Sequence, residues 1–150
     1  MNPNLFKVAE VQLIYKTKVK PAERLKISSS KDAFEIIKNY IKLEEHEHIE
    51  RVYIILLNRA NKVLGINKIA DGAQSGCIMD PKIIFQNVLK SNAASFIIWH
   101  NHPSGNLKPS KEDINISEKL KQASKLLDVS FLDHLIISND EKFYSLADNR

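Results

Sequence analysis

Residues 96–105 read Phe-Ile-Ile-Trp-His-Asn-His-Pro-Ser-Gly, and this stretch says most about how the chain folds. Its first four residues are an apolar run of β-branched and aromatic side chains, which predicts a short buried strand. Pro103 and Gly105 then end the strand and turn the chain. Because side chains two apart in an extended chain point to the same side, His100 and His102 can converge on one ion. The stretch therefore predicts a buried strand that ends in two candidate metal ligands.

Strand and helix patterns alternate on both sides of this stretch. The predicted strands are 8–15, 52–57, 62–69, 95–99, 129–137 and 143–146, and the predicted helices run from 29 or 30 to about 43, from 81 and from 110. Ser29 or Ser30, Asp80 and Ser110 supply the helix caps. We expect 52–57 and 62–69 to form a hairpin of central strands. This order predicts an α/β or α+β layered domain with a central sheet.

Size and composition limit the class of protein. The chain has 150 residues, 43% of them hydrophobic, which suits one compact domain with one core. Cys77 is the single cysteine, so the chain can form neither an internal disulfide nor a multi-cysteine zinc site. The longest apolar runs are too short to cross a bilayer. We therefore expect a cytoplasmic protein with no membrane segment.

The charge distribution leaves two interpretations open. Lys and Arg number 22 against 18 Asp and Glu, a net charge of +4, and residues 17–26 are basic. A basic stretch can contact nucleic acid or an acidic partner. At this charge density, a solvated surface is the simpler interpretation.

Asp113 is the candidate third ligand. With Ser110 as helix cap, Asp113 falls in the first turn of the next helix, a short loop away from the histidines. The same spacing is typical of a capping box, in which the acid bonds back to the cap's backbone N–H. Two histidines and one carboxylate leave a fourth position open, as catalytic zinc sites do. Both roles are therefore open for Asp113.

Together these residues resemble a known motif. The metalloprotease motif of the JAB/MPN/JAMM superfamily is resembled by Glu50, His100-x-His102-Pro103, Ser110 and Asp113. The flanking sequence is similar to the RadC family in particular. The resemblance covers roughly residues 45–148. It implies a RadC-like JAB/MPN domain over 45–150, with a three-layer αβα fold, a central mixed sheet and one zinc. Residues 1–44 would then supply a strand or arm and a helix packed on the core.

The resemblance also implies roles. His100, His102 and Asp113 would hold Zn²⁺ with a water in the fourth position, and Glu50 would act as general base. Ser110 would donate to the developing oxyanion, and otherwise serves only as the helix cap. The implied activity is cleavage of a peptide or isopeptide bond, with a peptide or protein as substrate.

Neighbouring residues of the same types fit this pattern less well. Glu50 directly precedes the predicted strand that starts at Arg51, which favours it over the other acids of 44–50. His46 and His48 also form a His-x-His pair, but no proline or third ligand follows at a suitable spacing, so we interpret them as a solvated face. Cys77 has no local pattern of a nucleophile and is interpreted as a small buried residue.

Other functions compete with hydrolysis of a peptide bond. One alternative is a DNA-repair-associated accessory protein that binds nucleic acid through residues 17–26, and another is a metal-dependent nuclease. RadC proteins usually carry an N-terminal helix-hairpin-helix region, and the roughly 45 residues before this domain are too few and too strand-like to supply it. That difference weakens the DNA alternative.

The positions of Trp99, Asp133 and His134 on predicted strands indicate which way their side chains point. Trp99 stands where RadC-like proteins often have a small residue, and strand alternation points it away from His100, so we expect it to pack in the core. Asp133 and His134 lie on a predicted strand and point to opposite faces. One of them could orient a metal ligand, or either could be a satisfied core residue.

Overall fold

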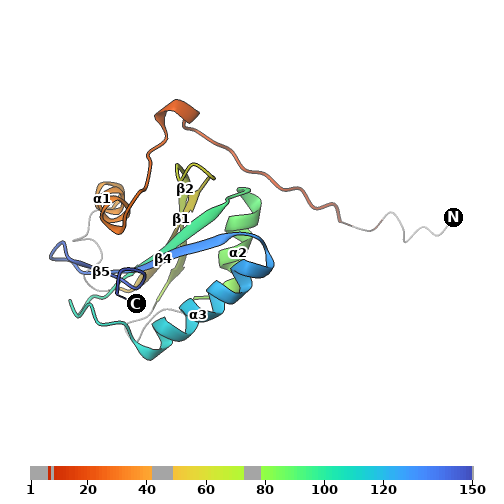
Figure 1. Ribbon diagram of the computed structural model, residues 1–150. Coiled ribbons are helices and arrows are strands. Elements are labelled where there is room, and N and C mark those ends of the chain that lie inside the picture. Colours follow the sequence, from red (N-terminus) through yellow and green to blue (C-terminus); the bar gives the residue numbers. More distant parts are fainter. Residues whose placement is uncertain (1–6, 8, 42–48, 73–78, 150) are drawn as a thin grey trace.

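The computed structural model describes residues 7, 9–41, 49–72 and 79–149, and its centre is one five-stranded sheet (Figure 1). The strand order is β2-β1-β3-β4-β5. The strands are β1 (Arg51–Leu57), β2 (Val63–Asp71), β3 (Ser95–Asn101), β4 (Ser130–Ile137) and β5 (Phe143–Ser145). The helices are the short 3₁₀ helix η2 (Pro21–Glu23), α1 (Ser30–Tyr40), α2 (Pro81–Lys90) and α3 (Lys111–Leu126).

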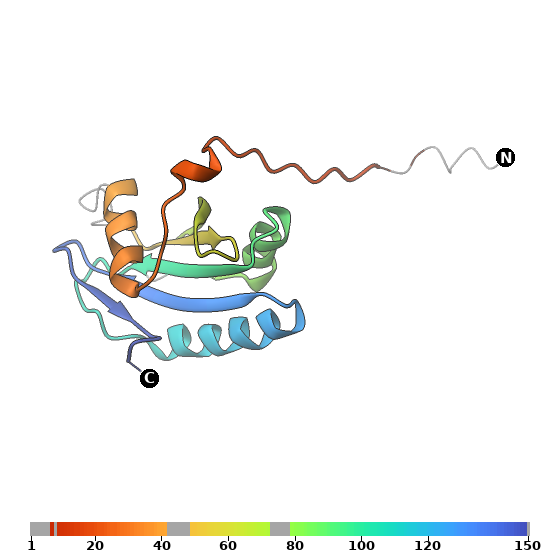
Figure 2. The same ribbon diagram turned by 45° about the horizontal axis from the view of Figure 1, so that its top comes forward.

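The sheet is mixed and has helices on both faces. β1 is antiparallel to β2 and β3, β3 is parallel to β4, and β4 is antiparallel to β5. Figure 2 shows α1 on one side of the sheet and α3 on the other. This arrangement confirms the three-layer αβα fold with a central mixed sheet. Within the described residues, no helix is both long enough and apolar enough to span a membrane.

Alternation along the strands builds two cores. Phe34 and Ile37 of α1 pack on one face of the sheet, where Trp99 is fully buried with its ring stacked on that of Tyr53 at 4.2 Å. The expectation that Trp99 packs in the core is confirmed. The other face packs against α2 and α3 through the residues Val52, Ile54, Leu56, Ile84, Phe85, Val88, Ala93, Phe96, Ile98 and Leu120. Side chains of the helices therefore cover both faces of the central strands.

Register places the ends of three strands together. Val52 pairs with His100 across the antiparallel β1–β3 ladder, and the same register, continued by two residues, sets Glu50 across from His102. On the other side of β3, Ile98 pairs with His134 in parallel. The backbone N–H of His102 donates to the carbonyl of Ile137 at 2.9 Å. Glu50, His100 and His102 therefore lie together at one end of these strands.

Two strand predictions were wrong. Residues 9–15 of the strand predicted at 8–15 form no ladder, and Val11 and Leu13 are 84% and 78% exposed. The β-propensity of this segment is not matched by a neighbouring strand, and the ribbon runs away from the domain toward the N-terminus (Figure 2). The hairpin of β1 and β2 is present, but β2 lies at the sheet edge and not at its centre. Central β1 is nearly all buried, whereas β2 is only partly buried.

The predicted helix starts hold. Ser29, Asp80 and Ser110 are the N-caps of α1, α2 and α3, and each side chain accepts a hydrogen bond from a backbone N–H of the first turn. α1 ends at Tyr40, and Leu43, where its end was predicted, lies outside the described residues.

Candidate metal centre

The side chains of His100, His102 and Asp113 meet at the end of β3. His100 is fully buried, and its Nε2 atom lies 2.9 Å from Nε2 of His102. The Oδ1 atom of Asp113, in the first turn of α3, is 3.4 Å from His100 Nε2, and its Oδ2 atom is 3.5 Å from His102 Nε2. The structure thus brings together the three residues expected as ligands, from one strand end and one helix start.

These separations suit a small tetrahedral ion. Zinc binds imidazole nitrogen and carboxylate oxygen at about 2.0–2.2 Å, so two ligands of a tetrahedral site lie about 3.3 Å apart. The two distances from Asp113 are close to that separation, each from a different carboxylate oxygen, and the distance between the histidine nitrogens is shorter by a few tenths of an ångström. The donor types therefore suit zinc, and binding would require both the rings and the carboxylate to adjust.

The hydrogen bonds around the rings leave lone pairs facing one another. His102 Nδ1 faces the backbone carbonyl of Asn106, which only accepts, so Nδ1 carries a hydrogen and Nε2 of the neutral ring has a lone pair. His100 Nε2 is surrounded by that nitrogen, by Oδ1 of Asp113 and by Oε1 of Glu50 at 3.5 Å. Such a cluster of acceptors calls for a cation at its centre.

Charges at the site shift two pKa values in opposite directions. Burial works to raise the pKa of Asp113, but the neighbouring His100 and His102 rings and the backbone N–H of Ser110 outweigh it and lower that pKa. The hydrogen bond with Asp113 raises the pKa of His102, against the effect of burial. A proton on His102 can therefore take the place of a metal cation, and metal binding would release it.

Asp113 has the capping role that the sequence left open, and its carboxylate also faces the two candidate ligands. Its Oδ2 atom accepts from the backbone N–H of Ser110 at 2.8 Å, and the hydroxyl oxygen of Ser110 accepts from the backbone N–H of Asp113 at 3.0 Å. This is a complete capping box. The same carboxylate faces both histidines, so the cap fixes the carboxylate in the direction that a ligand needs. The Ser110 hydroxyl is held beside this carboxylate by its hydrogen bond with the backbone of Asp113.

Glu50 is held in place by a residue that the sequence analysis passed over. Asn101 stands between the two histidines, and its side-chain NH₂ donates to the carbonyl of Ile49 at 2.9 Å. Its side-chain oxygen accepts from the backbone N–H of Arg51 at 2.8 Å. Asn101 therefore binds the backbone on both sides of Glu50. The signal in the sequence is weak, because an asparagine between two histidines is ordinarily taken as a spacer.

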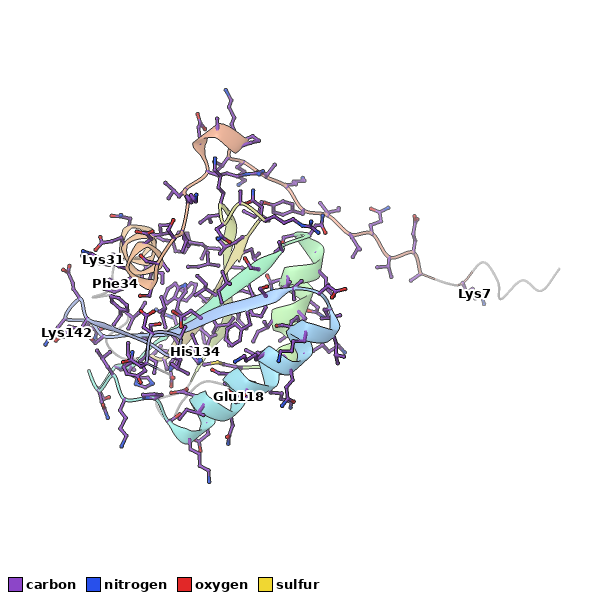
Figure 3. The ribbon with its side chains drawn as sticks, in the orientation of Figure 1. Lys7, Lys31, Phe34, Glu118, His134 and Lys142 are labelled. Atoms are coloured by element: carbon purple, nitrogen blue, oxygen red, sulfur yellow. The ribbon has the colours of Figure 1, made fainter. Side chains whose placement is uncertain are left out.

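His134 and Asp133 separate as strand alternation predicts. His134 is buried on β4, and its Nε2 atom lies 2.7 Å from Nδ1 of His100. Asp133 bonds to the hydroxyl of Ser145 and to the backbone N–H of Ala147, so it is a satisfied core residue. Burial raises the pKa of Asp133, partly offset by these bonds, and lowers the pKa of His134 to about 3. Figure 3 places His134 between β4 and α3.

Ligand-type side chains form two overlapping groups among the described residues. One contains Glu50, His100 and His102, and the other contains His100, Asp113 and His134, with ligand atoms within 4.8 Å of one another in each. His100 is common to both. The expectations for Cys77, His46 and His48 concern residues that lie outside the described part of the chain.

Comparisons with known proteins agree with the fold. The RadC-like JAB domain model matches residues 27–150. The chain is 42% identical over 123 residues to a UPF0758 protein of Flavobacterium johnsoniae, which covers 82% of this chain and 52% of the relative. A UPF0758 protein of Clostridium tetani is 40% identical over 122 residues, covering 80% and 51%. One from Clostridium perfringens is 36% identical over 143 residues, covering 94% and 60%.

The chain spans about half the length of the first two of these relatives. The family match extends over more than half of the chain and includes α1, the whole sheet and every residue of the cluster described above. The chain therefore belongs to the RadC-like JAB domain family.

Proposed function

We propose that the chain is a zinc-dependent hydrolase that cleaves a peptide or isopeptide bond. The observation that carries the proposal is the convergence of acceptor atoms from His100, His102 and Asp113 around one point, with the Glu50 carboxylate beside it. Zinc bound there would lower the pKa of a water to about 7 and so supply a nucleophile at neutral pH.

The residues of the chain then divide the remaining work. The Glu50 carboxylate takes a proton from the water as its oxygen attacks the carbonyl carbon, and gives that proton to the leaving amine. The Ser110 oxygen already accepts a hydrogen bond from the helix backbone, so its own hydrogen can be donated to the oxyanion. The buried ring of His100 keeps one side of the centre dry.

Metal analysis of protein purified without chelator tests the first part of the proposal. We expect about one zinc per chain, and we expect the zinc to be lost in His100→Ala and in Asp113→Ala, because each removes one of three ligands. His48→Ala serves as the matched control and should keep its zinc. Well-folded protein that contains no metal and also rejects added zinc would contradict the proposal, and salt-dependent DNA binding would then be measured.

Screening of peptide and isopeptide substrates tests the second part. Cleavage by the zinc-loaded protein that stops when the metal is removed would support a peptidase. Cleavage of DNA or RNA under the same conditions, with none of any peptide, would replace the proposed scissile bond by a phosphodiester.

We expect Asn101→Ala to separate activity from metal binding. Without its two hydrogen bonds the backbone on each side of Glu50 is released, and a shift of about 1 Å in a catalytic group can cost about 10²-fold in rate. The measurement is kcat on a cleaved substrate together with zinc content, which should stay near that of the wild type. Asn67→Ala on β2 of the same sheet, which removes a side-chain bond to Asn87 of α2, is the control. An unchanged kcat in Asn101→Ala would contradict the positioning role.

A further inference from the structure

We propose that Ser117 and His134 form a hydrogen-bond relay that fixes the tautomer of His100, so that its Nε2 lone pair is turned toward the metal. The inference rests on the proposed metal centre and assigns His134 as a positioning residue, not as a ligand. The relay runs from a helix carbonyl through Ser117, His134 and His100 to the cluster of acceptors.

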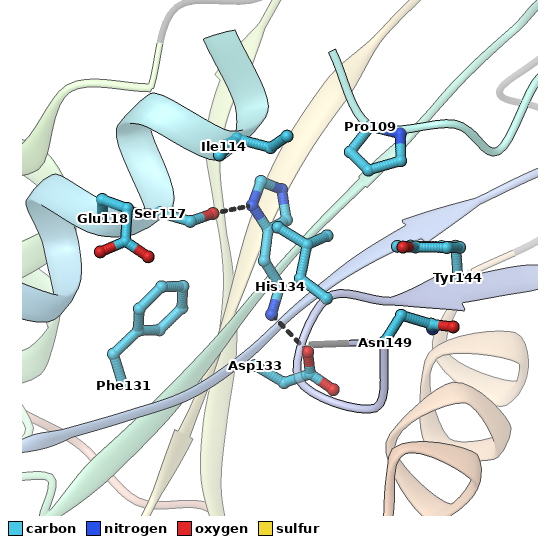
Figure 4. A pocket seen from close by; sticks show the side chains of 10 residues that line it. Pro109, Ile114, Ser117, Glu118, Phe131, Asp133, His134, Tyr144 and Asn149 are labelled. Carbon is cyan, nitrogen blue, oxygen red and sulfur yellow. Dashed lines mark hydrogen bonds between the residues drawn. The ribbon is translucent and has the colours of Figure 1, made fainter. Parts of the chain in front are cut away.

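The relay starts at a group that can only accept. The Ser117 hydroxyl lies 2.8 Å from the backbone carbonyl of Asp113, one turn earlier in α3, and donates to it. The same hydroxyl oxygen is 2.7 Å from Nδ1 of His134. Since the hydroxyl hydrogen is used on the carbonyl, the oxygen accepts, and Nδ1 of His134 carries the hydrogen. Figure 4 shows the Ser117 hydroxyl directed at this ring.

The direction then passes to His100. A neutral imidazole has one donor and one acceptor, so His134 with a hydrogen on Nδ1 presents a lone pair at Nε2. That lone pair lies 2.7 Å from Nδ1 of His100, which must therefore carry a hydrogen. Nε2 of His100 is left as the lone pair, and this is the atom that faces Asp113 and His102.

The reversed relay is disfavoured by the geometry at its far end. If Ser117 donated to His134 instead, every hydrogen bond would reverse and His100 would carry its hydrogen on Nε2, where no metal could bind. The Ser117 oxygen and the Asp113 carbonyl oxygen would then be 2.8 Å apart with no hydrogen between them. The serine, one turn after the ligand Asp113 on the same helix, therefore sets the direction.

Packing keeps the relay intact. His134 is 1% exposed, and its backbone N–H is bound by the carboxylate of Asp133 at 2.7 Å. A cavity of about 220 Å³ adjoins the ring and is lined in part by Pro109, Phe131 and Tyr144 (Figure 4). His100, His102 and Asp113 are not among the residues that line it. The relay is comparable to the bonds that metal-bound histidines usually make through their second ring nitrogen.

The tautomer can be measured in metal-free protein by long-range ¹H–¹⁵N NMR of the imidazole rings. We expect hydrogen on Nδ1 of both His100 and His134 in the wild type. In Ser117→Ala and in His134→Leu we expect His100 to shift toward the form with hydrogen on Nε2. Wild-type His100 with its hydrogen on Nε2 would overturn the relay whether or not the protein binds zinc.

Zinc affinity, measured by competition with a chromophoric chelator, gives the second readout. His134→Leu should weaken binding about 10–100-fold, the usual cost of removing a partner of a metal-bound histidine. His134→Gln, whose amide oxygen can accept from His100, should recover most of that loss. Equal affinity in wild type and His134→Leu would contradict the inference while leaving the metal centre intact, whereas a wild type that binds no zinc would contradict the proposed function.

Ser124→Ala is the matched control for Ser117→Ala. Ser124 is a buried serine of α3, whereas Ser117 is partly buried, and the Ser124 hydroxyl donates to the carbonyl of Leu120 at 2.7 Å, one turn earlier. It makes the same local bond without an imidazole partner in the relay. Ser124→Ala should leave both the His100 tautomer and the zinc affinity unchanged. If the two serine variants had equal effects, the relay would be contradicted, because only the loss of helix bonding would be responsible.

Discussion

Glu50→Gln should lower the rate of hydrolysis by about 10²–10⁴-fold while the zinc content stays that of the wild type. Glutamine has the shape of glutamate, but its amide cannot take a proton from water at neutral pH. The Glu50 side chain is 18% exposed and its carboxylate lies 3.5 Å from His100 Nε2, so it is open to water and yet beside the ligands. The measurement is kcat/KM on a cleaved substrate.

The control for this variant is Glu35→Gln, which changes an exposed acid of α1 in the same way. It should leave kcat/KM and zinc content unchanged. Should Glu50→Gln retain a rate within about threefold of the wild type with its zinc in place, another group must take the proton, and the assignment of Glu50 as base would be wrong.

Trp99→Ala should destabilise the fold by about 3–5 kcal/mol, the usual cost of truncating a large buried aromatic residue. The indole is fully buried and stacks on Tyr53, with rings 4° from parallel. Both the area removed from water and the ring contact are lost with the side chain. Urea unfolding followed by circular dichroism measures the change in free energy of unfolding.

Leu126→Ala is the comparison, because this leucine is 87% exposed at the end of α3 and should change stability by less than about 0.5 kcal/mol. Trp99 faces α1, on the opposite side of the sheet from His100. Trp99→Ala protein that is still folded should therefore keep its zinc. A loss of less than about 1 kcal/mol would contradict the packing role of Trp99.

The sequence predicted those structural features that residues close together along the chain determine. The caps Ser29, Asp80 and Ser110 were predicted because a short polar side chain before an apolar periodic run satisfies the free N–H groups of a helix start. The central strands were predicted because a short continuous run of apolar residues must be buried, and in a domain of this size it is buried as an inner strand of the sheet. The strand expected at 8–15 failed because a strand needs a partner, and no local pattern contains one.

The cluster of site residues was predictable only in part. The spacing of the histidines and of Asp113 is local, and a resemblance supplied Glu50. The roles of Asn101 and Ser117 depend on pairs far apart in the sequence: the register of β1 on β3 for one, and the packing of α3 against β4 for the other. A serine one turn after Asp113 gains a role only when His134 is brought beside it.

The capping box at the start of α3 gives Asp113 a structural role besides its proposed role as a metal ligand, and this affects which of the site residues can be lost. Any change that removes its carboxylate also removes the half of the capping box that accepts from the backbone N–H of Ser110, and so weakens the start of the helix. His102, which directly follows β3, is not part of this capping box, so its replacement would leave the start of α3 intact. A related protein that had lost the proposed catalysis should therefore still contain the aspartate and lack the histidine.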